Sequence, residues 1–328
     1  MKKLILILVL LSFTLTAQSP YGNEPFAHTY SIVTRDAETG EMGVAVQSNW
    51  FSVGTIVTWA EAGVGAIATQ SFVNPAFGPD GLKLLKEGKT ADEALDILIA
   101  SDESREVRQL AIIDNNGNTA VFTGEKCVQY AGHIEGNGFT VQANLMASPD
   151  VWPAMKKSYL ENAGLPLAER MLAALEAAQD AGGDVRGKQS AAILVVAPKS
   201  SGKIWQDRLV DLRIEDHPEP LKEIKRVLKV HRAYEHMNRG DLAVEHGDMQ
   251  LAMEEYSAAE KMFPENLEMK FWRAVTLANN GRLEESLPLF KEIFVKNMNW
   301  HALIPRLIKP GLLTVSEEEL QKILNVVE

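Results

Sequence analysis

The apolar positions in the first two thirds of the chain form short runs with the length and composition of β-strands. Three such runs lie at residues 30–34, 42–47 and 55–58, and a glycine-spaced apolar run follows at residues 63–69. The polar turn between the first two runs ends in Gly40, so we expect a hairpin there. Small residues within the runs favour a sheet that other layers cover closely on both faces.

Helical periodicity alternates with further strand patterns over the next part of the chain. Thr90 and Glu93 form a capping box that predicts the start of a helix, and the Asn-Asn-Gly-Asn sequence at 115–118 predicts a hairpin. The expected elements are helices at 81–87, 91–100, 149–161 and 165–181, and strands at 107–114, 119–123, 139–145, 190–197 and 205–214. Their order predicts helices that cover a pair of mostly antiparallel sheets, an α+β layered sandwich.

After the His-Pro-Glu-Pro sequence at 217–220, the apolar positions follow a helical period only. Small residues, an aromatic residue and a proline recur as in a helix-turn-helix repeat, at Gly240, Gly247, Ala252, Tyr256, Ala259 and Pro264. A second copy lies 34 residues later, at Ala274, Gly281, Ser286, Phe290, Ile293 and Met298. This spacing resembles the tetratricopeptide repeat. Two copies are few for such an array, so we expect helices at 221–230 and 317–326 to cap them.

The first residues of the chain have the layout of a secretory signal peptide. Two lysines precede an apolar run at 4–11, and a small alanine precedes Gln18. We therefore expect a signal peptide at 1–17, a leader at 18–27, and a secreted or periplasmic protein. The apolar run is shorter than the ~20 residues that a membrane-spanning helix requires, and we expect no span elsewhere in the chain.

Charge and cysteine content narrow the classes of partner. The formal net charge is −11 and the pI is about 5.3, which argues against nucleic acid or an anionic membrane as a partner. Cys127 is the single cysteine, so an internal disulfide framework and a multi-cysteine zinc site are excluded. A lone cysteine packs more often as a small buried hydrophobe than it acts as a nucleophile. We expect neither a metal nor a cofactor.

Familiar catalytic motifs give little guidance. The chain has no zinc-binding HExxH motif, Walker loop or GxSxG elbow, and no dinucleotide-binding GxGxxG motif in a strand–helix context. A metal site could be assembled from Asp207, Asp211, Asp216 and His217, but charges on an exposed strand face and a polar cap explain these residues more simply. His133, beside a glycine-rich turn, is either an acid–base group or a structural histidine.

Long sequence blocks occur in a fixed order between Thr29 and Pro220. They include HTYSIVTRD, GVAVQSNWFSVG, WAEAGVGAIATQSFVNPAFGPDGL, RQLAIID, AGH, FTVQANLM, GGDVRGKQSAAILVV and VDLRIEDHPEP. These blocks resemble an uncharacterised bacterial family catalogued as domain of unknown function 1028. The resemblance implies an N-terminal-nucleophile (Ntn) hydrolase-like fold, a four-layer αββα sandwich at 28–220, ahead of an all-α repeat region at 221–328. It implies a superfamily and no particular substrate.

The resemblance also implies a candidate nucleophile. Ntn hydrolases use a Thr, Ser or Cys at the start of the first strand, and its own α-amino group is the base once the preceding peptide bond is cut. An α-amine with a pKa near 8 is partly neutral at working pH, unlike a lysine. The matching position here is Thr29. Ser31 shares a face with Thr29 by the two-residue period of a strand, and Ser48 is expected on a neighbouring strand, so these three are the predicted catalytic residues.

Polar residues at strand ends and turns are the predicted substrate-binding groups. They are Asn49, Gln70, Asn74, His133, Gln142 and Asn144. A carbonyl oxygen that develops negative charge needs such donors, although buried amides also commonly satisfy backbone groups. Signal cleavage before Gln18 leaves eleven residues ahead of Thr29. A free Thr29 amine therefore requires a second cut, between His28 and Thr29.

Three functions remain open at this point. The first is an exported Ntn-type amidohydrolase that acts on an amide or small peptide-like substrate and docks a protein partner through its repeats. The second is a non-catalytic, ligand-binding protein of the same fold, in which Thr29 only begins a strand. The third is an interaction protein whose function lies in the helical repeats. The resemblance, together with the small-residue sheet faces, predicts a homodimer.

Overall fold

The computed structural model describes residues 26–327. The predicted signal peptide and residues 18–25 of the predicted leader lie outside the described residues. The chain divides into two compact units, and the boundary lies between Ile224 and Lys225. The sequence pattern changes a few residues earlier, at 217–220.

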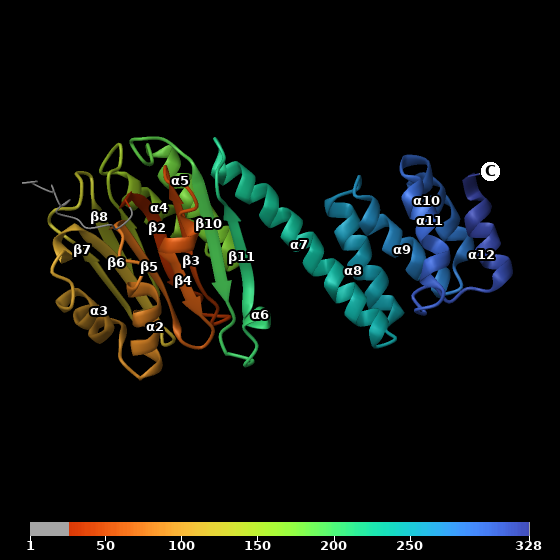
Figure 1. The fold of residues 1–328 in the computed structure, drawn as a ribbon, viewed down its shortest axis with the longest axis horizontal. Helices are drawn as coiled ribbons and strands as arrows, with labels where there is room; N and C mark the ends of the chain where they lie inside the picture. Colours follow the sequence, from red (N-terminus) through yellow and green to blue (C-terminus); the bar gives the residue numbers. More distant parts are fainter. Residues whose placement is uncertain (1–25, 328) are drawn as a thin grey trace, which may run out of the picture. The chain divides into compact units, whose positions relative to one another are not determined.

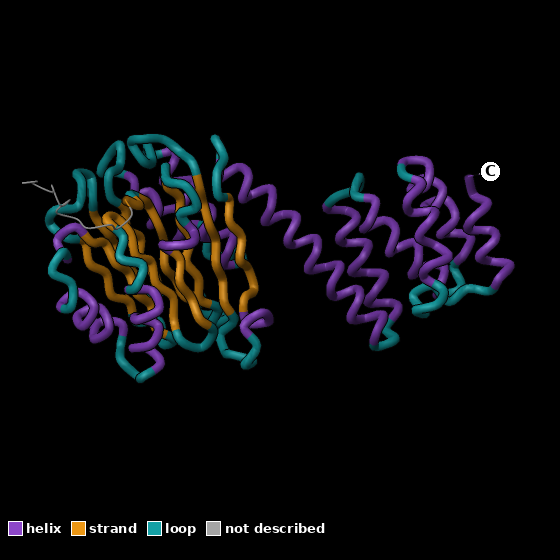
Figure 2. Tube along the Cα trace, viewed as in Figure 1, coloured by secondary structure: helices purple, strands orange, loops and turns teal. Residues whose placement is uncertain are grey.

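Two antiparallel sheets are stacked in the first unit (Figures 1 and 2). One sheet has the order β1-β5-β6-β7, with β4 also paired to β5, and the other has the order β11-β10-β3-β2-β9-β8. The strands of the first sheet are β1 (Phe26–Ala27), β4 (Thr58–Glu61), β5 (Gly65–Phe72), β6 (Arg108–Asp114) and β7 (Thr119–Thr123). Those of the second are β2 (Thr29–Arg35), β3 (Met42–Ser48), β8 (Gly132–Gly136), β9 (Phe139–Ala143), β10 (Ser190–Val196) and β11 (Arg208–Ile214).

Helices cover the outer face of each sheet. α2 (Phe77–Lys86) and α3 (Ala91–Ala100) pack on the first sheet through an apolar cluster that includes Ile67 of β5. α4 (Val151–Glu161) and α5 (Leu167–Asp180) contact the second sheet. The first unit is therefore a four-layer αββα sandwich, as the sequence predicted.

Small residues allow these layers to approach closely. Between the sheets, Val44 and Val46 of β3 pack with Ala66 of β5 in one apolar cluster. On the other face of β3, a Cβ atom added to Gly43 would lie 2.7 Å from the terminal methyl group of Met171 in α5. A larger residue at position 43 would push α5 away from the sheet, which explains why the strand patterns are rich in glycine and alanine.

The strand predicted at 55–58 is wrong in its first part. The chain forms a short helix there, α1 (Gly54–Val57), and β4 begins at Thr58. The Thr58 hydroxyl donates to the carbonyl oxygen of Gly54 at 2.7 Å, and local bonds of this kind compete with a strand ladder. A Cβ atom added to Gly54 would lie 2.4 Å from Cβ of Ala192 in β10, so close packing against the second sheet also favours this turn.

Two further differences involve short elements. β8 was not predicted, because glycines at both of its ends interrupt the alternation; it pairs with β9 and places His133 opposite Gln142. A short helix, α6 (Ile204–Asp207), takes the place of the first residues of the strand predicted at 205–214. The 3₁₀ turn η1 (Arg105–Val107) precedes β6.

The second unit is a run of helices. These are α7 (Pro220–Glu245), whose first turns belong to the first unit, α8 (Met249–Met262), α9 (Leu267–Asn279), α10 (Leu283–Lys296), α11 (Met298–Leu303) and α12 (Glu317–Leu324), with 3₁₀ turns η2 (Ile304–Leu307) and η3 (Asn325–Val327). Gly247 and Gly281 adopt φ of 76° and 71° in the turns after α7 and α9, where the predicted repeats require glycine. None of the described helices combines the length and apolar character that crossing a bilayer requires.

The predicted repeat positions pack where paired helices cross. Ala252, Tyr256 and Ala259 of α8 are buried in one cluster with Ala233 of α7. Gly240 of α7 lies under the Tyr256 ring, since a Cβ atom added there would be 2.6 Å from the ring. The small residues thus let α7 and α8 close on the aromatic side chain between them.

Replacing Ala252 by leucine tests this packing. Ala252→Leu should overpack the crossing and lower the free energy of unfolding of the second unit by about 1–3 kcal/mol. Hydrogen exchange of the full chain should show faster exchange in residues 225–327 and unchanged exchange in residues 26–224. Glu254→Leu, at an exposed position of the same helix, is the control; an equal effect of the two variants would contradict the packing argument.

Candidate functional site

Polar side chains replace apolar ones between the sheets near the start of β2. Ser31 Oγ donates to Gln70 Oε1 of β5 at 2.6 Å and accepts from Gln142 Nε2 of β9 at 2.6 Å. All three side chains are completely buried. The Ser31 hydroxyl of β2 therefore links β9, the neighbouring strand in the second sheet, to β5 of the first sheet.

Gln109 of β6 extends this buried network. Its Oε1 accepts from Gln70 Nε2 at 2.6 Å and from Asn144 Nδ2 at 2.9 Å. Its Nε2 donates to Thr123 Oγ1 at 2.8 Å and to the carbonyl oxygen of Ala143 at 3.0 Å. Buried amides are tolerated when both ends find partners. Gln109 meets this requirement with partners from both sheets.

The peptide bond between His28 and Thr29 lies at the edge of this network, and two donors hold its carbonyl group. Ser48 Oγ donates to the His28 carbonyl oxygen at 2.6 Å, and Arg186 Nη2 donates to the same oxygen at 2.8 Å. The Thr29 hydroxyl, next in the chain, donates to the carbonyl oxygen of Ala27 at 2.6 Å. Two donors on one carbonyl oxygen, one of them cationic, form the arrangement that stabilises an oxyanion.

Asp184 orients the arginine of this pair. Its completely buried carboxylate accepts from Arg186 Nε at 3.0 Å and Nη2 at 2.7 Å, and from the backbone N–H of Asn49 at 3.1 Å. The turn that carries both residues includes Gly187 with a φ of 125°, a backbone conformation that residues other than glycine rarely adopt. A bidentate contact fixes the direction of the guanidinium group and leaves its other N–H groups for the His28 carbonyl.

The residues ahead of Thr29 cross from one sheet to the other. β1 pairs antiparallel with the end of β5, with Ala27 opposite Ser71, whereas Thr29 begins β2 in the second sheet opposite Ser48. Ser71 has a φ of 74°, a left-handed conformation that costs free energy for a residue other than glycine. Such strained positions gather at functional sites.

The imidazole of His28 fills the space beside this crossing. It is 2% exposed, its Nδ1 lies 2.7 Å from Asn144 Oδ1, and its ring meets the Phe72 ring edge-on with centroids 5.6 Å apart. Burial lowers the pKa of His28, so the ring is neutral at pH 7. The neutral ring donates from Nδ1, because the amide oxygen of Asn144 can only accept.

The predicted site residues fall into three groups. Six of them are joined through the buried network and the His28 carbonyl: Thr29, Ser31, Ser48, Gln70, Gln142 and Asn144. Asn49 reaches the cluster through its backbone N–H, and His133 attaches at an exposed position through Thr123 Oγ1 at 2.8 Å. Asn74 lies apart, because its side chain binds Asp102 and the backbone of Ala76 at the start of α2.

The other chemical groups of the chain have separate surroundings. Burial raises the pKa of the Cys127 thiol, which donates to the carbonyl oxygen of Arg108 at 3.3 Å. Asp207 binds Ser200 and Ser201, Asp211 binds two arginines, and Asp216 binds Gln189. Residues 26–327 contain no group of three or more side chains placed to hold a metal ion.

Comparison with known proteins identifies the family. A model of the family of unknown function DUF1028 matches residues 29–224, which is more than half of the chain. The chain belongs to this family. A tetratricopeptide-repeat model matches residues 237–294, so the predicted repeat is confirmed. No curated protein matches the chain.

A solved member of the family has a similar fold. The sequence of protein SPO2555 from Silicibacter pomeroyi is 30% identical to that of this chain, and its crystal structure matches with a TM-score of 0.56. The likeness covers 62% of this chain and 85% of that chain. It confirms the mixed α/β first unit with two sheets.

Sequence reasoning missed the residues that complete the site. Gln109, Asp184 and Arg186 were not among the predicted site residues. The Gly-Gly-Asp-Val-Arg-Gly sequence at 182–187 held a signal, since glycines on both sides of an Asp-x-Arg pair, just before an apolar strand, indicate a constrained turn. The contact of Arg186 with a carbonyl 158 residues away is visible only in three dimensions.

Removal of the Gln70 amide tests how far the two sheets depend on this network. Gln70→Leu should leave the Ser31 hydroxyl without its acceptor and lower the free energy of unfolding by about 1–3 kcal/mol for each buried group that loses its partner. Gln206→Leu, at an exposed position of the same unit, should stay within about 0.5 kcal/mol of the original protein. Urea unfolding of the full chain measures both, and equal midpoints for the two variants would contradict the prediction.

Proposed function

We propose that this protein is an exported Ntn-type amidohydrolase, which acts on amide or small peptide-like substrates after cutting its own His28–Thr29 peptide bond. The observation that carries the proposal is the pair of donors, Ser48 and Arg186, on the His28 carbonyl oxygen beside the Thr29 hydroxyl. A second donor on one backbone carbonyl oxygen, here a guanidinium group, polarises the carbonyl more strongly than the single partner that such a group needs, and this favours chemistry at that bond.

The proposed self-cleavage uses groups that are already in place. The Thr29 oxygen attacks the His28 carbonyl carbon, and Ser48 and Arg186 bind the oxygen that becomes negatively charged. The C–N bond then breaks, the Thr29 nitrogen takes a proton, and an ester joins His28 to the Thr29 oxygen. Water hydrolyses this ester, which gives a leader that ends in a carboxylate and a chain that begins with the free amine of Thr29.

The same groups then serve hydrolysis of a substrate. The free α-amine of Thr29 accepts the proton of the Thr29 hydroxyl, and the hydroxyl oxygen attacks the substrate carbonyl carbon. The substrate C–N bond then breaks, the amine leaves with that proton, and water hydrolyses the ester on Thr29 to release the acid. Ser48 and Arg186, no longer bound to the His28 carbonyl, donate to the substrate oxygen instead. Asn144 and Gln70 hold the Thr29 carbonyl, with nitrogen–oxygen distances of 3.4 and 3.3 Å, and keep the nucleophile in position.

The position of the leader supports a peptide-like substrate. β1 pairs with β5 as an extended strand, and His28 fills a space beside Phe72 and Asn144. Departure of these residues would free the end of β5 for an extended backbone in the same place. A planar group that accepts or donates hydrogen bonds fits the space of the imidazole.

The repeats and the exposed apolar residues support roles in assembly. Tetratricopeptide repeats indicate protein partners, so we place partner docking in the second unit. We also propose a homodimer, with Val185 (60% exposed), between Asp184 and Arg186, and Phe51 (62% exposed), two residues after Asn49, as contacts. Size measurement of the full chain at micromolar concentration checks this, and a monomer there would contradict it.

Intact mass and N-terminal sequencing of the exported protein test the proposed mechanism. The purified chain should begin at Thr29, and Thr29→Ala should leave a chain that begins at Gln18. Thr29→Ser should still be cut. Ser48→Ala and Arg186→Gln should each slow the cut by about 10²–10³-fold, the usual cost of losing one oxyanion donor.

Arg105→Gln removes an exposed arginine of the same unit and serves as the control, with normal cleavage expected. A chain that begins at Gln18 and hydrolyses an amide would exclude the α-amine mechanism. A chain that stays uncut and hydrolyses no peptide amide would favour the non-catalytic, ligand-binding alternative.

A further inference from the structure

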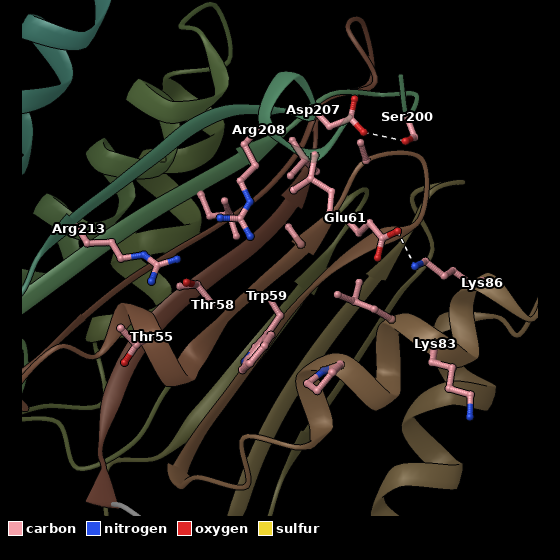
Figure 3. Close-up of a pocket in the computed structure, with 17 residues that line it drawn as sticks. Thr55, Thr58, Trp59, Glu61, Lys83, Lys86, Ser200, Asp207, Arg208 and Arg213 are labelled. Carbon is pink, nitrogen blue, oxygen red and sulfur yellow. Dashed lines mark hydrogen bonds and ion pairs between the residues drawn. The ribbon is translucent and has the colours of Figure 1, made fainter. Parts of the chain in front are cut away.

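A cavity lies between the two sheets, away from Thr29. It has a volume of about 640 Å³ and opens where β4 and α2 on one side face β10 and β11 on the other. Its floor is apolar and includes Trp59, Leu82, Leu194 and Val196. Figure 3 shows this cavity with its charged side chains around the floor.

β11 places charged side chains on the inner face of the sheet. Arg213 lies opposite Ala192 in the regular part of the ladder, and the register shift between Val195 and Val196 places Arg208 opposite Val196. Val196 and Ala192 face the space between the sheets. Both arginines therefore point inward from an edge strand, and Figure 3 shows them on the same side of the cavity.

The charges around this cavity have a positive excess. Glu61 neutralises Lys86 in an ion pair of 2.6 Å, and Asp207 is held by Ser200 at 2.7 Å. Asp211 lies between the arginines, accepting from Arg208 Nη1 at 2.7 Å and from Arg213 Nε at 3.1 Å.

One carboxylate shared by two guanidinium groups leaves one positive charge and several of their ten N–H groups for a ligand. Lys83, exposed on α2, adds a positive charge on the opposite wall and Asp207 offsets one, so four cations and three carboxylates leave a net charge of +1. The positive charge at this cavity is opposite in sign to the net charge of the whole chain, which is −11.

Trp59 is fixed in a position that offers ring surface to a ligand. Its Nε1 donates to the carbonyl oxygen of Ile56 at 3.0 Å, so its polar atom is already satisfied. Gly78 of α2 lies against the ring, because a Cβ atom added there would be 2.2 Å from it. The indole ring is therefore fixed in position and provides an apolar surface in the same cavity as the two arginines.

We propose that this cavity binds a small organic carboxylate with an apolar body. The carboxylate meets the guanidinium groups of Arg208 and Arg213, which match its two oxygens geometrically. The apolar body lies on Trp59 and the apolar floor. This site shares no residue with the cluster around Thr29 and does not depend on the proposed hydrolase activity.

Protection of the sheet edge is the competing explanation for the arginines. Inward-pointing charges on an edge strand discourage pairing with another molecule. That role predicts self-association when the charges are removed and no selective binding of anions. The two explanations therefore differ in what arginine variants do.

Calorimetric titration of the full chain with decanoate, below its micelle concentration, tests the proposal. Decanoate should bind, decan-1-ol should bind at least 10-fold more weakly, and decylammonium should not bind. Arg208→Gln and Arg213→Gln should each weaken decanoate binding at least 5-fold, and the double variant should lose it. Lys126→Gln, which removes an exposed positive charge outside the cavity, should bind as the original does.

Fluorescence of Trp59 locates the bound ligand. Decanoate should change the tryptophan emission of the original chain, and Trp59→Phe should remove that change. Failure of decanoate to bind at millimolar concentration would overturn the proposal. Equal binding of decan-1-ol, or unchanged decanoate binding by the double arginine variant, would overturn it as well. Self-association of a double variant that still binds decanoate would establish edge protection in its place.

Discussion

Burial of polar groups between two sheets is the constraint on which the first unit depends. A hydroxyl or amide in this layer costs free energy unless its donors and acceptors find partners. Ser31, Gln70 and Gln109 meet that requirement only because strands from both sheets bring them together. The network therefore fixes how the sheets lie on each other at the start of β2, whereas the apolar contacts of Val44 and Val46 stabilise the remainder with little directional preference.

The same constraint explains why the Asp184–Arg186 pair has such exact partners. A carboxylate without solvent contact requires a cation and further donors, and Arg186 and the Asn49 N–H provide them. Arg186 in turn brings a positive charge to the His28 carbonyl. Arg186 thus has a structural role and a proposed chemical one: it pairs with the buried Asp184 carboxylate, and it polarises the His28–Thr29 peptide bond beside the Thr29 hydroxyl.

The sandwich offers two chemically different places between its sheets. Near Thr29 the layer is filled by hydrogen-bonded side chains and by the residues that precede the nucleophile. Near β4 and β11 a cavity with an apolar floor lies between the sheets, and the register shift in β11 brings Arg208 to the same face as Arg213. The strand order separates the two places: β4 and β1 share one edge of β5, while the second sheet continues past β3 to β10 and β11.

The sequence by itself determined the layered fold and the helical repeats, because apolar periodicity, capping residues and turn glycines act over a few neighbouring residues. It also placed Thr29 and Ser31 on one face, since a strand alternates its side chains. It could not determine that residues 54–57 form a helical turn, which depends on Gly54 packing against Ala192. Only the tertiary structure joined Arg186 and Ser48 at the His28 carbonyl, because hydrogen bonds between residues far apart in the chain follow from how the strands are ordered and not from local propensity.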